Sequence, residues 1–243
     1  MQDQRVIIIT GATGGLGRAL AQPFGRAGCR ILVHYHRNKK AAEKLVRDLE
    51  RLGAEAMPFQ ADVQSLAEIK SMTEAVLKRW DRIDVLIANA AIRKDALLVR
   101  TTEDAWDATL DTNLTGVWNC LKAVGEPFLR QRDGRVVAVG SAAGVHGRAG
   151  QSNYAASKAG LIGLIRSVAM EWAPYNIQLN IVFPGLQPTG MTAGLTAGQR
   201  KAVDRQNLLG HSAPIAEVAE FVYFLSRMTG VSGQIFNLDS RVV

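Results

Sequence analysis

The chain has 243 residues, of which 47% are hydrophobic and 21% charged, so it can bury a sizeable core and is not an intrinsically disordered segment. No apolar run approaches the ~20 residues that a membrane-spanning helix needs, and the first apolar stretch is too short for a signal peptide. Lys and Arg outnumber Asp and Glu by 29 to 22, and the net charge of +7 favours anionic partners; because the basic residues are scattered and not interleaved with aromatics, nucleic-acid binding is not expected.

Short apolar runs, which are predicted strands, alternate along the chain with segments whose apolar residues recur every three or four positions, which are predicted helices. In chain order the prediction is a strand at 6–9, a helix at 16–27, a strand at 30–35, a helix at 42–52, a strand at 55–60, a helix at 66–80, a strand at 83–88, a helical region at about 102–130, a strand at 135–140, a helix at 152–172, and strands at 178–183 and 234–238.

Alternating strands and helices are typical of right-handed βαβ crossovers. The chain is therefore predicted to form an α/β fold in which about seven parallel strands are flanked by helices on both faces, as a single domain over residues 1–243. In such sheets ligands bind beyond the carboxyl ends of the strands, where the strand order reverses. Functional residues are therefore expected in the loops that follow the strands.

The cysteine spacing bears on metal binding and on the compartment. Cys29 and Cys120 are 91 positions apart and belong to no CxxC or Cys/His cluster. This spacing predicts no metal site and no disulfide framework, and it favours a reducing, cytoplasmic setting. Both side chains are expected to pack as small apolar groups.

A glycine-rich turn, Thr-Gly-Ala-Thr-Gly-Gly-Leu-Gly over residues 10–17, separates the first predicted strand from the first predicted helix. Glycine lets the backbone approach a ligand closely, and the first amides of a helix suit a pyrophosphate. An ordinary tight turn is the alternative, but the order of strand, turn and helix favours a dinucleotide site. The spacing differs from the general Gly-x-Gly-x-x-Gly fingerprint, and no Gly-Lys-Ser/Thr follows as in a P-loop. The residues expected to contact the cofactor here are Gly11, Thr13, Gly15, Leu16 and Gly17.

The segment after the second predicted strand indicates which dinucleotide binds. A carboxylate there would hold the 2′-hydroxyl of the adenosine ribose, whereas an arginine accommodates a 2′-phosphate. This chain has Arg37 and no carboxylate in the segment 34–39, so NADP(H) is favoured over NAD(H); the alternative is that Arg37 is a solvated charge at the start of a helix. Asp62 and Val63, after the third strand, fit an adenine contact, although Asp62 could equally cap the next helix.

Three polar residues form a candidate catalytic set. Ser141 follows the predicted strand at 135–140, and Tyr154 and Lys158 lie about one turn apart on one face of the next helix. A phenol with a pKa of roughly 10 exchanges protons slowly at neutral pH, and a nearby ammonium favours its ionised form. Tyr154 is therefore predicted to act as a general acid toward a substrate carbonyl oxygen that Ser141 also hydrogen-bonds. A nucleophilic Ser141 is a poorer hypothesis, because no Gly-x-Ser-x-Gly elbow surrounds it.

The ordered set of glycine-rich turn, Asn89-Ala90-Ala91, Asn113, Ser141, Tyr154 and Lys158 resembles the classical short-chain dehydrogenase/reductase family over essentially the whole chain. The resemblance implies a Rossmann-type, doubly wound sheet. It implies that Ser141, Tyr154 and Lys158 form the catalytic triad, that Lys158 also holds the nicotinamide ribose, and that Asn113 anchors a proton-relay water. The further cofactor contacts that it implies are Asn89 and Ala90 beside the adenosine ribose, and Pro184, Gly185, Leu186 and Thr189 at the nicotinamide carboxamide, with a mobile substrate lid around 187–210.

Within that family, residues 150–163 are very similar to the active-site stretch of the 3-oxoacyl-acyl-carrier-protein reductases. The activity implied is NADPH-dependent reduction of a 3-oxoacyl thioester, on acyl carrier protein or CoA, to the 3-hydroxyacyl product, with Tyr154 as the general acid. His146 and Gln151 would border the substrate cleft. Arg132 matches a basic docking position for the acidic carrier, in agreement with the net charge. The resemblance also implies a homotetramer or homodimer packed through long helices.

Several residues depart from that reductase pattern. Tyr175 stands where a second basic docking residue is expected, Phe183 replaces the usual alanine before a Pro-Gly pair, and Gly14 replaces a basic residue of the turn. These departures leave open a different substrate, such as another secondary alcohol, a sugar or a cyclic ketone. A catalytically silent dinucleotide sensor is a further alternative, but it predicts losses in the triad, which is intact.

The remaining histidines and tryptophans receive structural interpretations. His34 and His36 could touch a cofactor phosphate, but solvated histidines at a strand end are the favoured interpretation. Trp106, Trp118 and Trp172 occur at helical spacings and are predicted to pack at helix–helix contacts.

Overall fold

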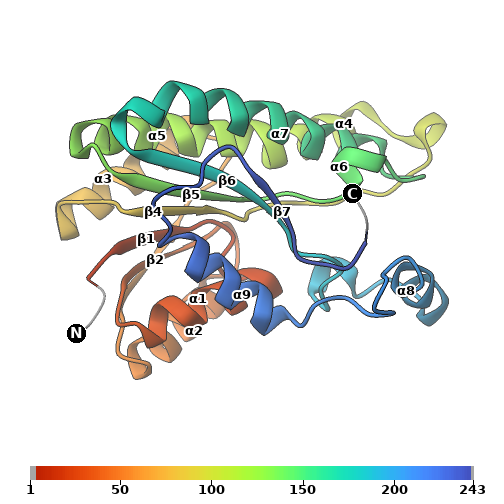
Figure 1. Cartoon of the computed structure of the whole chain (residues 1–243), viewed down its shortest axis with the longest axis horizontal. Coiled ribbons are helices and arrows are strands. Elements are labelled where there is room, and N and C mark those ends of the chain that lie inside the picture. Colours follow the sequence, from red (N-terminus) through yellow and green to blue (C-terminus); the bar gives the residue numbers. More distant parts are fainter. Residues whose placement is uncertain (1–3, 242–243) are drawn as a thin grey trace.

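The computed structural model describes residues 4–241, which contain one seven-stranded parallel sheet between two layers of helices (Figure 1). The predicted α/β, Rossmann-type fold is thereby confirmed. The strands are β1 (Val6–Ile9), β2 (Arg30–Tyr35), β3 (Glu55–Gln60), β4 (Val85–Ala88), β5 (Gly134–Val139), β6 (Ile177–Phe183) and β7 (Ile235–Asn237). Their order in the sheet is β3-β2-β1-β4-β5-β6-β7.

The helices of residues 4–241 cover both faces of the sheet. They are α1 (Gly15–Arg26), α2 (Lys39–Arg51), α3 (Leu66–Trp80), α4 (Glu103–Leu110), α5 (Gly116–Gln131), α6 (Ala143–His146), α7 (Ser152–Trp172), α8 (Ala197–Asp204) and α9 (Ile215–Leu225). Helices α1, α2 and α9 pack on one face, and α3, α5 and α7 pack on the other (Figure 1).

The strand order reverses at β1. From β1 the chain winds outward through β2 and β3, and β4 then returns to the opposite side of β1. The carboxyl ends of β1 and β4 lie level, because Ile9 pairs with Ile87. The connections that follow these two strands leave toward opposite faces of the sheet, which opens a crevice at their carboxyl ends.

The core explains why the strand predictions succeed. All four side chains of β1 are fully buried: Val6 and Ile8 pack toward α3, α5 and α7, whereas Ile7 and Ile9 pack toward α1, α2 and α9. A strand with two buried faces is a continuous apolar run, which is what the sequence has here. Each buried side chain of this size contributes about 2 kcal/mol.

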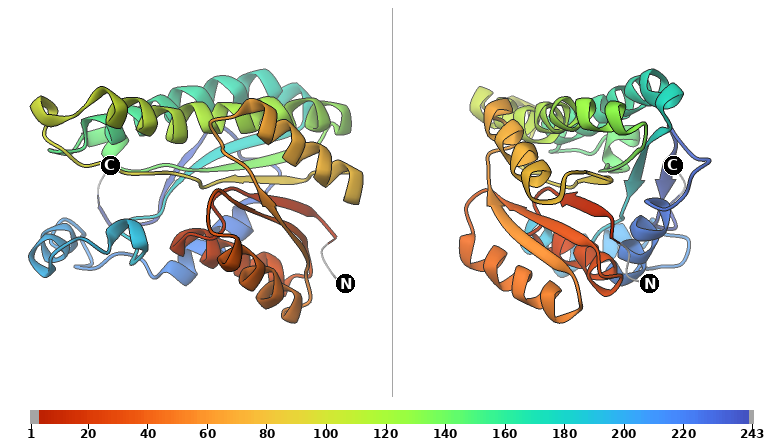
Figure 2. Two further views of the ribbon diagram at one scale, coloured as in Figure 1. Left: turned by 180° about the vertical axis from the view of Figure 1, so that it is seen from behind. Right: turned by 90° about the vertical axis from the view of Figure 1, so that its left-hand side faces the viewer.

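The predicted helical region at about 102–130 is divided into two helices. A π-helical turn at Asp111–Thr115 separates α4 from α5. Such turns insert one extra residue into a helix and occur mostly at functional sites. The sequence analysis also missed α9, which is apolar on most of its surface, and the short helices α6 and α8. Helix α8 stands apart from the sheet, beyond the carboxyl ends of the strands (Figure 2).

Side-chain packing confirms some of the remaining predictions. Cys29 and Cys120 are both buried, as predicted. Trp172 is partly buried and meets the ring of Phe128 edge-on, with ring centroids 6.5 Å apart. Trp106 and Trp118 are 36% and 42% exposed, so their packing at helix–helix contacts stays a prediction.

No helix within residues 4–241 combines the length and the apolar character needed to cross a bilayer.

Candidate active site

A single elongated cavity of about 1550 Å³ lies at the carboxyl ends of the strands. It extends from the end of β2 past the glycine-rich turn to α7, and every predicted catalytic, cofactor or substrate residue except Asn113 contributes to its lining. The predicted residues that line it are Gly11, Thr13, Gly15, Leu16, Gly17, Arg37, Asp62, Val63, Asn89, Ala90, Ser141, His146, Gln151, Tyr154, Lys158, Pro184, Gly185, Leu186 and Thr189.

The glycine-rich turn follows β1 and passes directly into α1. Gly11 has a φ of +60°, and a Cβ there would lie 2.9 Å from the Cα of Ala90. A Cβ on Gly17 would overlap the carbonyl oxygen of Gly11, and a Cβ on Gly15 would lie 2.7 Å from the Cγ2 of Thr189. The turn is therefore packed against the loop after β4, against Thr189 and against its own first residues, and only glycine fits at these positions. The cradle suits the phosphates of a dinucleotide at the N-terminus of α1.

Asn89 ties this turn to the end of β4. Its Nδ2 donates to the carbonyl oxygens of Thr10 (2.9 Å) and Gly11 (3.1 Å). The Oγ1 of Thr10 in turn accepts from the backbone N–H groups of Asn89 (2.9 Å) and Ala90 (3.0 Å). Four hydrogen bonds thus fix the two loops that border the crevice.

His34 is buried, and the prediction of a solvated histidine is wrong for it. Its side chain is 2% exposed. Its Nδ1 accepts a hydrogen bond from the N–H of Gly11 (2.9 Å), and its Nε2 lies 2.9 Å from the carbonyl oxygen of Ala61. Because Nδ1 is an acceptor, the proton of the neutral ring is on Nε2. Burial lowers the pKa of His34 to about 4, so the ring is neutral at neutral pH. His36, by contrast, is exposed.

This pKa makes stability depend on pH. In the unfolded chain the pKa of a histidine is 6.5, and in the folded protein that of His34 is about 4, so the unfolded chain binds more protons between these values. The stability that neutral His34 contributes is therefore lost as the pH falls through this window. The charged or titratable groups that act on the ring are Asp62 and Glu68, which raise its pKa, and His36, which lowers it.

Relative to His34→Asn, the wild type is expected to lose about 2 kcal/mol of its free energy of unfolding when the pH falls from about 7 to about 4.5, because only the wild type has the buried histidine. Urea denaturation of both proteins at several pH values measures this difference, and comparison with the variant removes the contribution of the carboxylates that titrate in the same range. A difference that stays constant across the window contradicts the buried neutral ring.

The end of the cavity near β2 carries Arg37 and Asp62. Arg37 is exposed and makes no ion pair with any residue in 4–241. Asp62 is not the cap of α3: Ser65 is, accepting from the N–H of Glu68 (3.3 Å), while Oδ1 of Asp62 accepts from the N–H of Gln64 (3.0 Å). The capping alternative for Asp62 is therefore wrong.

The candidate catalytic side chains converge at the other end of the cavity. Lys158 is buried, and its Nζ lies 5.8 Å from the ring centroid of Tyr154 and donates to the carbonyl oxygen of Val139 (2.6 Å). The side chain of Ser141 hydrogen-bonds Tyr154. Ser141 Oγ also accepts from the N–H of Ala143 (3.2 Å), which fixes its position at the end of β5. The i, i+4 spacing on α7 thus places the phenol beside the amine.

Burial dominates the electrostatics of this pair. It raises the pKa of Tyr154, and the hydrogen bond from Ser141 and the charge of Arg93 offset only part of this rise, while Asp95 adds to it. Burial also lowers the pKa of Lys158 to about 8. In the protein by itself Tyr154 is therefore a neutral hydrogen-bond donor. A neighbouring ammonium was expected to lower the pKa of Tyr154. That expectation is wrong for the protein by itself, because burial raises this pKa.

Asn113 lies behind the cavity wall, in the π-helical turn. It is fully buried; its Oδ1 accepts from the N–H of Ile92 (2.8 Å), and its Nδ2 donates to the carbonyl oxygen of Ile92 (3.0 Å) and to Oγ of Ser157 (3.1 Å). Asn113 thus joins the loop after β4 to α7. Both hydrogens of its amide are used in these contacts.

The sequence analysis missed two charged residues beside Tyr154. Arg93, with a side chain 15% exposed, lies 3.2 Å from Asp95 through its Nε, and Gln151 Nε2 donates to Oδ2 of Asp95 (3.1 Å). An isolated β-bridge between Ala96 and Gln151 holds this loop against the start of α7. The contact joins residues more than fifty positions apart, so no local pattern in the sequence indicates it.

Arg132 and Phe183 lie outside the cavity. Arg132 is exposed at the end of α5, where its Nη2 donates to the carbonyl oxygen of Pro174 (3.1 Å) and its guanidinium lies 5.4 Å from the ring centroid of Tyr175. Phe183 is buried against Gly140. It therefore does not shape the cavity.

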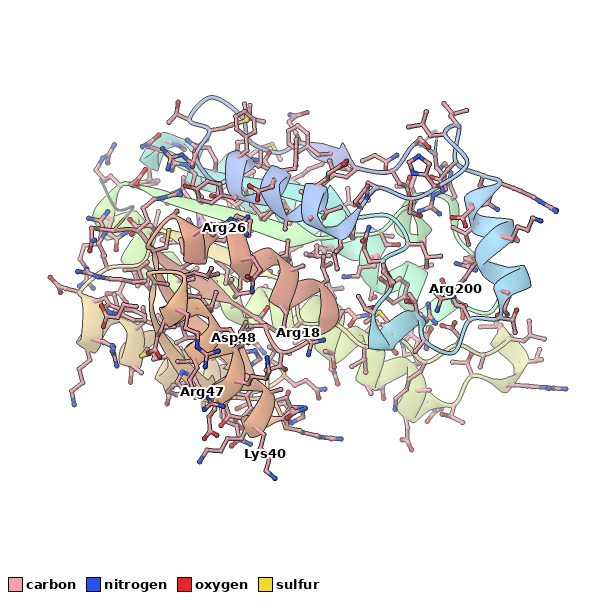
Figure 3. The ribbon with its side chains drawn as sticks, turned by 90° about the horizontal axis from the view of Figure 1, so that it is seen from below. Arg18, Arg26, Lys40, Arg47, Asp48 and Arg200 are labelled. Atoms are coloured by element: carbon pink, nitrogen blue, oxygen red, sulfur yellow. The ribbon has the colours of Figure 1, made fainter. Side chains whose placement is uncertain are left out.

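The segment 187–210 covers the cavity from the side of α8. Thr192 Oγ1 donates to the carbonyl oxygen of Gln187 (2.6 Å), and Arg200 of α8 donates from Nη2 to the carbonyl oxygen of Thr192 (3.0 Å; Figure 3). Met191, Val203 and other residues of this segment line the cavity.

No group of three or more His, Cys, Asp or Glu side chains in the described part of the chain is placed to hold a metal ion.

Comparisons with known proteins agree with this geometry. The family model described as short chain dehydrogenase matches residues 5–200. Three curated relatives bear the name 3-oxoacyl-acyl-carrier-protein reductase. The relative from Thermotoga maritima is 38% identical over 99% of this chain and 98% of its own length. The relative from Synechocystis sp. is 36% identical over 98% and 97% of the two chains, and that from Staphylococcus aureus is 34% identical over 98% of each. The chain therefore belongs to the short-chain dehydrogenase family and is an oxidoreductase that works with a nicotinamide cofactor.

Proposed function

We propose that the protein reduces the ketone of a 3-oxoacyl thioester, carried on acyl carrier protein or CoA, to the 3-hydroxyacyl product with NADP(H). The observation that carries the chemistry is the convergence of Tyr154, Ser141 and Lys158 in the cavity. The substrate class rests on the names of the three relatives, whose identity to this chain extends over nearly its whole length.

Ser141, Tyr154 and Lys158 have different roles in protonating the ketone oxygen. When bound, the nicotinamide supplies the hydride that adds to the ketone carbon. Ser141 hydrogen-bonds the ketone oxygen, and the hydroxyl of Tyr154 gives it a proton as negative charge develops there, so that C=O becomes CH–OH. Lys158, with a pKa of about 8, exchanges protons near neutral pH and can return one to Tyr154.

Asn113 has a supporting part in the proposal. Both of its amide hydrogens are already used, so a relay water beside Lys158 would be held by other atoms of Asn113, such as its main-chain carbonyl oxygen.

The experiment that tests the function is a substrate comparison. The purified protein is mixed with NADPH and acetoacetyl-CoA, or acetoacetyl-acyl carrier protein, while the nicotinamide absorbance is followed. We expect turnover with both, at different rates. Failure with every 3-oxoacyl thioester, together with reduction of a sugar or a cyclic ketone, would reject the acyl substrate and keep the chemistry. Phe183 no longer favours such an alternative, because it does not line the cavity.

The preference for NADP(H) rests on Arg37, which faces the cavity with no carboxylate paired to it within residues 4–241. We expect Arg37→Ser to raise KM for NADPH by about 10- to 100-fold, because a charge-assisted contact to the 2′-phosphate is lost, and to leave KM for NADH unchanged.

Lys40→Ser is the matched control, because Lys40 carries the same charge three positions away and projects outward from the start of α2 (Figure 3). It does not line the cavity. If both substitutions raised KM for NADPH equally, the preference would depend on the overall positive charge of this region and not on a contact from Arg37.

Carrier docking and assembly complete the proposal. Arg132, exposed and supported by Tyr175, offers a cation to an acidic carrier.

The exposed Trp118 of α5 and Met170 of α7 support a homodimer or homotetramer packed through these helices. The segment 187–210 serves as a lid that orders over the bound substrate.

A further inference from the structure

His34 connects three segments that border the cavity. It stands near the end of β2, its ring contacts Gly11 in the glycine-rich turn, and on the other side it contacts Ala61 just after β3. It lines the cavity and is itself almost completely buried. The His34 ring therefore contacts the glycine-rich turn from inside the protein.

Two consecutive amides of the turn, those of Gly11 and Ala12, both bond to this residue. The N–H of Gly11 donates to Nδ1 of His34, and the N–H of Ala12 donates to the main-chain oxygen of His34 (3.0 Å). The carbonyl of Gly11 is meanwhile held by Asn89 and by the N–H of Gly14 (3.1 Å). The peptide before Gly11 and the peptide after it are thus fixed from both sides, although glycine at a φ of +60° has wide conformational freedom.

We propose that His34 is a positioning residue that holds the glycine-rich turn in the conformation that receives the cofactor phosphates, by accepting the Gly11 N–H at Nδ1 while donating from Nε2 to Ala61. The proposal rests on the assigned role of the turn as a cofactor site. His34 itself touches no reacting atom. It acts through Gly11, whose amide would otherwise lack an acceptor inside the protein and could turn toward the cavity.

Two substitutions separate the two hydrogen bonds. The Oδ1 of an asparagine occupies the position of Nδ1 in histidine, so His34→Asn keeps the acceptor for Gly11 and loses the donor to Ala61. The Nε2 of a glutamine occupies the position of Nε2 in histidine, so His34→Gln keeps the donor and loses the acceptor. Both variants remove the same buried ring, so they are expected to lower the free energy of unfolding by similar amounts.

The test measures the Kd for NADPH by fluorescence titration, together with kcat at saturating NADPH. We expect His34→Gln to raise Kd by about tenfold or more and His34→Asn to raise it by less than about threefold, with kcat changed little in either. His211→Gln is the control, because His211 is exposed in the loop after α8 and does not line the cavity. Equal affinities for the Asn and Gln variants would overturn the proposal.

A second measurement does not depend on the variants folding. Long-range ¹H–¹⁵N NMR of the wild-type protein identifies the protonated nitrogen of each histidine. We expect one ring to be neutral with the proton on Nε2 at pH values well below the ordinary pKa of histidine, and its signal to be absent in His34→Asn. A His34 ring with its proton on Nδ1, or a charged one at neutral pH, contradicts the proposal. NADPH binding without turnover of any 3-oxoacyl thioester would reject the substrate class but leave the role of His34 intact.

Discussion

Replacing Tyr154 with phenylalanine is expected to lower kcat for ketone reduction by about 1000-fold, because a positioned general acid contributes on the order of 10²–10⁴ in rate. The substitution removes one hydroxyl and keeps the ring beside Lys158. The Kd for NADPH is expected to change by less than about threefold, since the turn that holds the phosphates is untouched. Steady-state kinetics and cofactor titration measure the two quantities separately.

Tyr175→Phe is the matched control for this substitution. Tyr175 is partly exposed near the end of α7, under the guanidinium of Arg132, and does not line the cavity. Its kcat with a CoA thioester should equal that of the wild type. Full activity of Tyr154→Phe would overturn the assigned chemistry, whereas loss of NADPH binding would indicate a structural role for the hydroxyl.

Gly17→Ala is expected to raise the Kd for NADPH by at least about 100-fold and to lower the free energy of unfolding by about 1–3 kcal/mol. The new Cβ would overlap the carbonyl oxygen of Gly11 and lie 2.8 Å from the Cα of Ala12. Both neighbours are backbone atoms, so no side-chain rotation relieves the contact, and the turn has to open away from α1.

The control for this second substitution is Gly230→Ala. Gly230 lies in the loop before β7, where a Cβ would meet nothing within 4 Å. Urea denaturation and fluorescence titration of both variants are expected to show wild-type behaviour for Gly230→Ala. Unchanged NADPH affinity in a folded Gly17→Ala would mean that the turn does not receive the cofactor.

Local patterns in the sequence were sufficient to predict the sheet. The bounds of β1, β2 and β3 match the predicted segments. β1 is buried on both faces and is therefore a continuous apolar run bounded by turn residues, whereas β3 is an edge strand whose residues are mostly exposed or half-buried. The glycine-rich turn and the Tyr154–Lys158 pair were also predictable from local patterns. Each depends on spacing within a few residues, either around one strand-to-helix turn or along one face of α7.

Features that depend on contacts between distant segments were not predictable. A histidine at the end of an apolar run is typical of a solvated strand end, and His34 is buried only because Gly11 and Ala61 supply its partners. The π-helical turn at Asp111–Thr115 has no periodic signature in the sequence, and its Asn113 bonds to Ile92 and Ser157, which are distant along the chain. Burial also reverses the expected direction of the Tyr154 pKa, and burial is a property of the folded chain.

The most direct test of the account follows a labelled hydride. The protein is incubated with NADPH deuterated at C4 of the nicotinamide and with acetoacetyl-acyl carrier protein, and the product is analysed by mass spectrometry and NMR. With NADPH that carries deuterium at both C4 positions, we expect one deuterium on C3 of a 3-hydroxybutyryl thioester from the wild type, and formation of the same product about 1000-fold more slowly with Tyr154→Phe. Deuterated NADPH that stays unoxidised with this and every other 3-oxoacyl thioester would contradict the account.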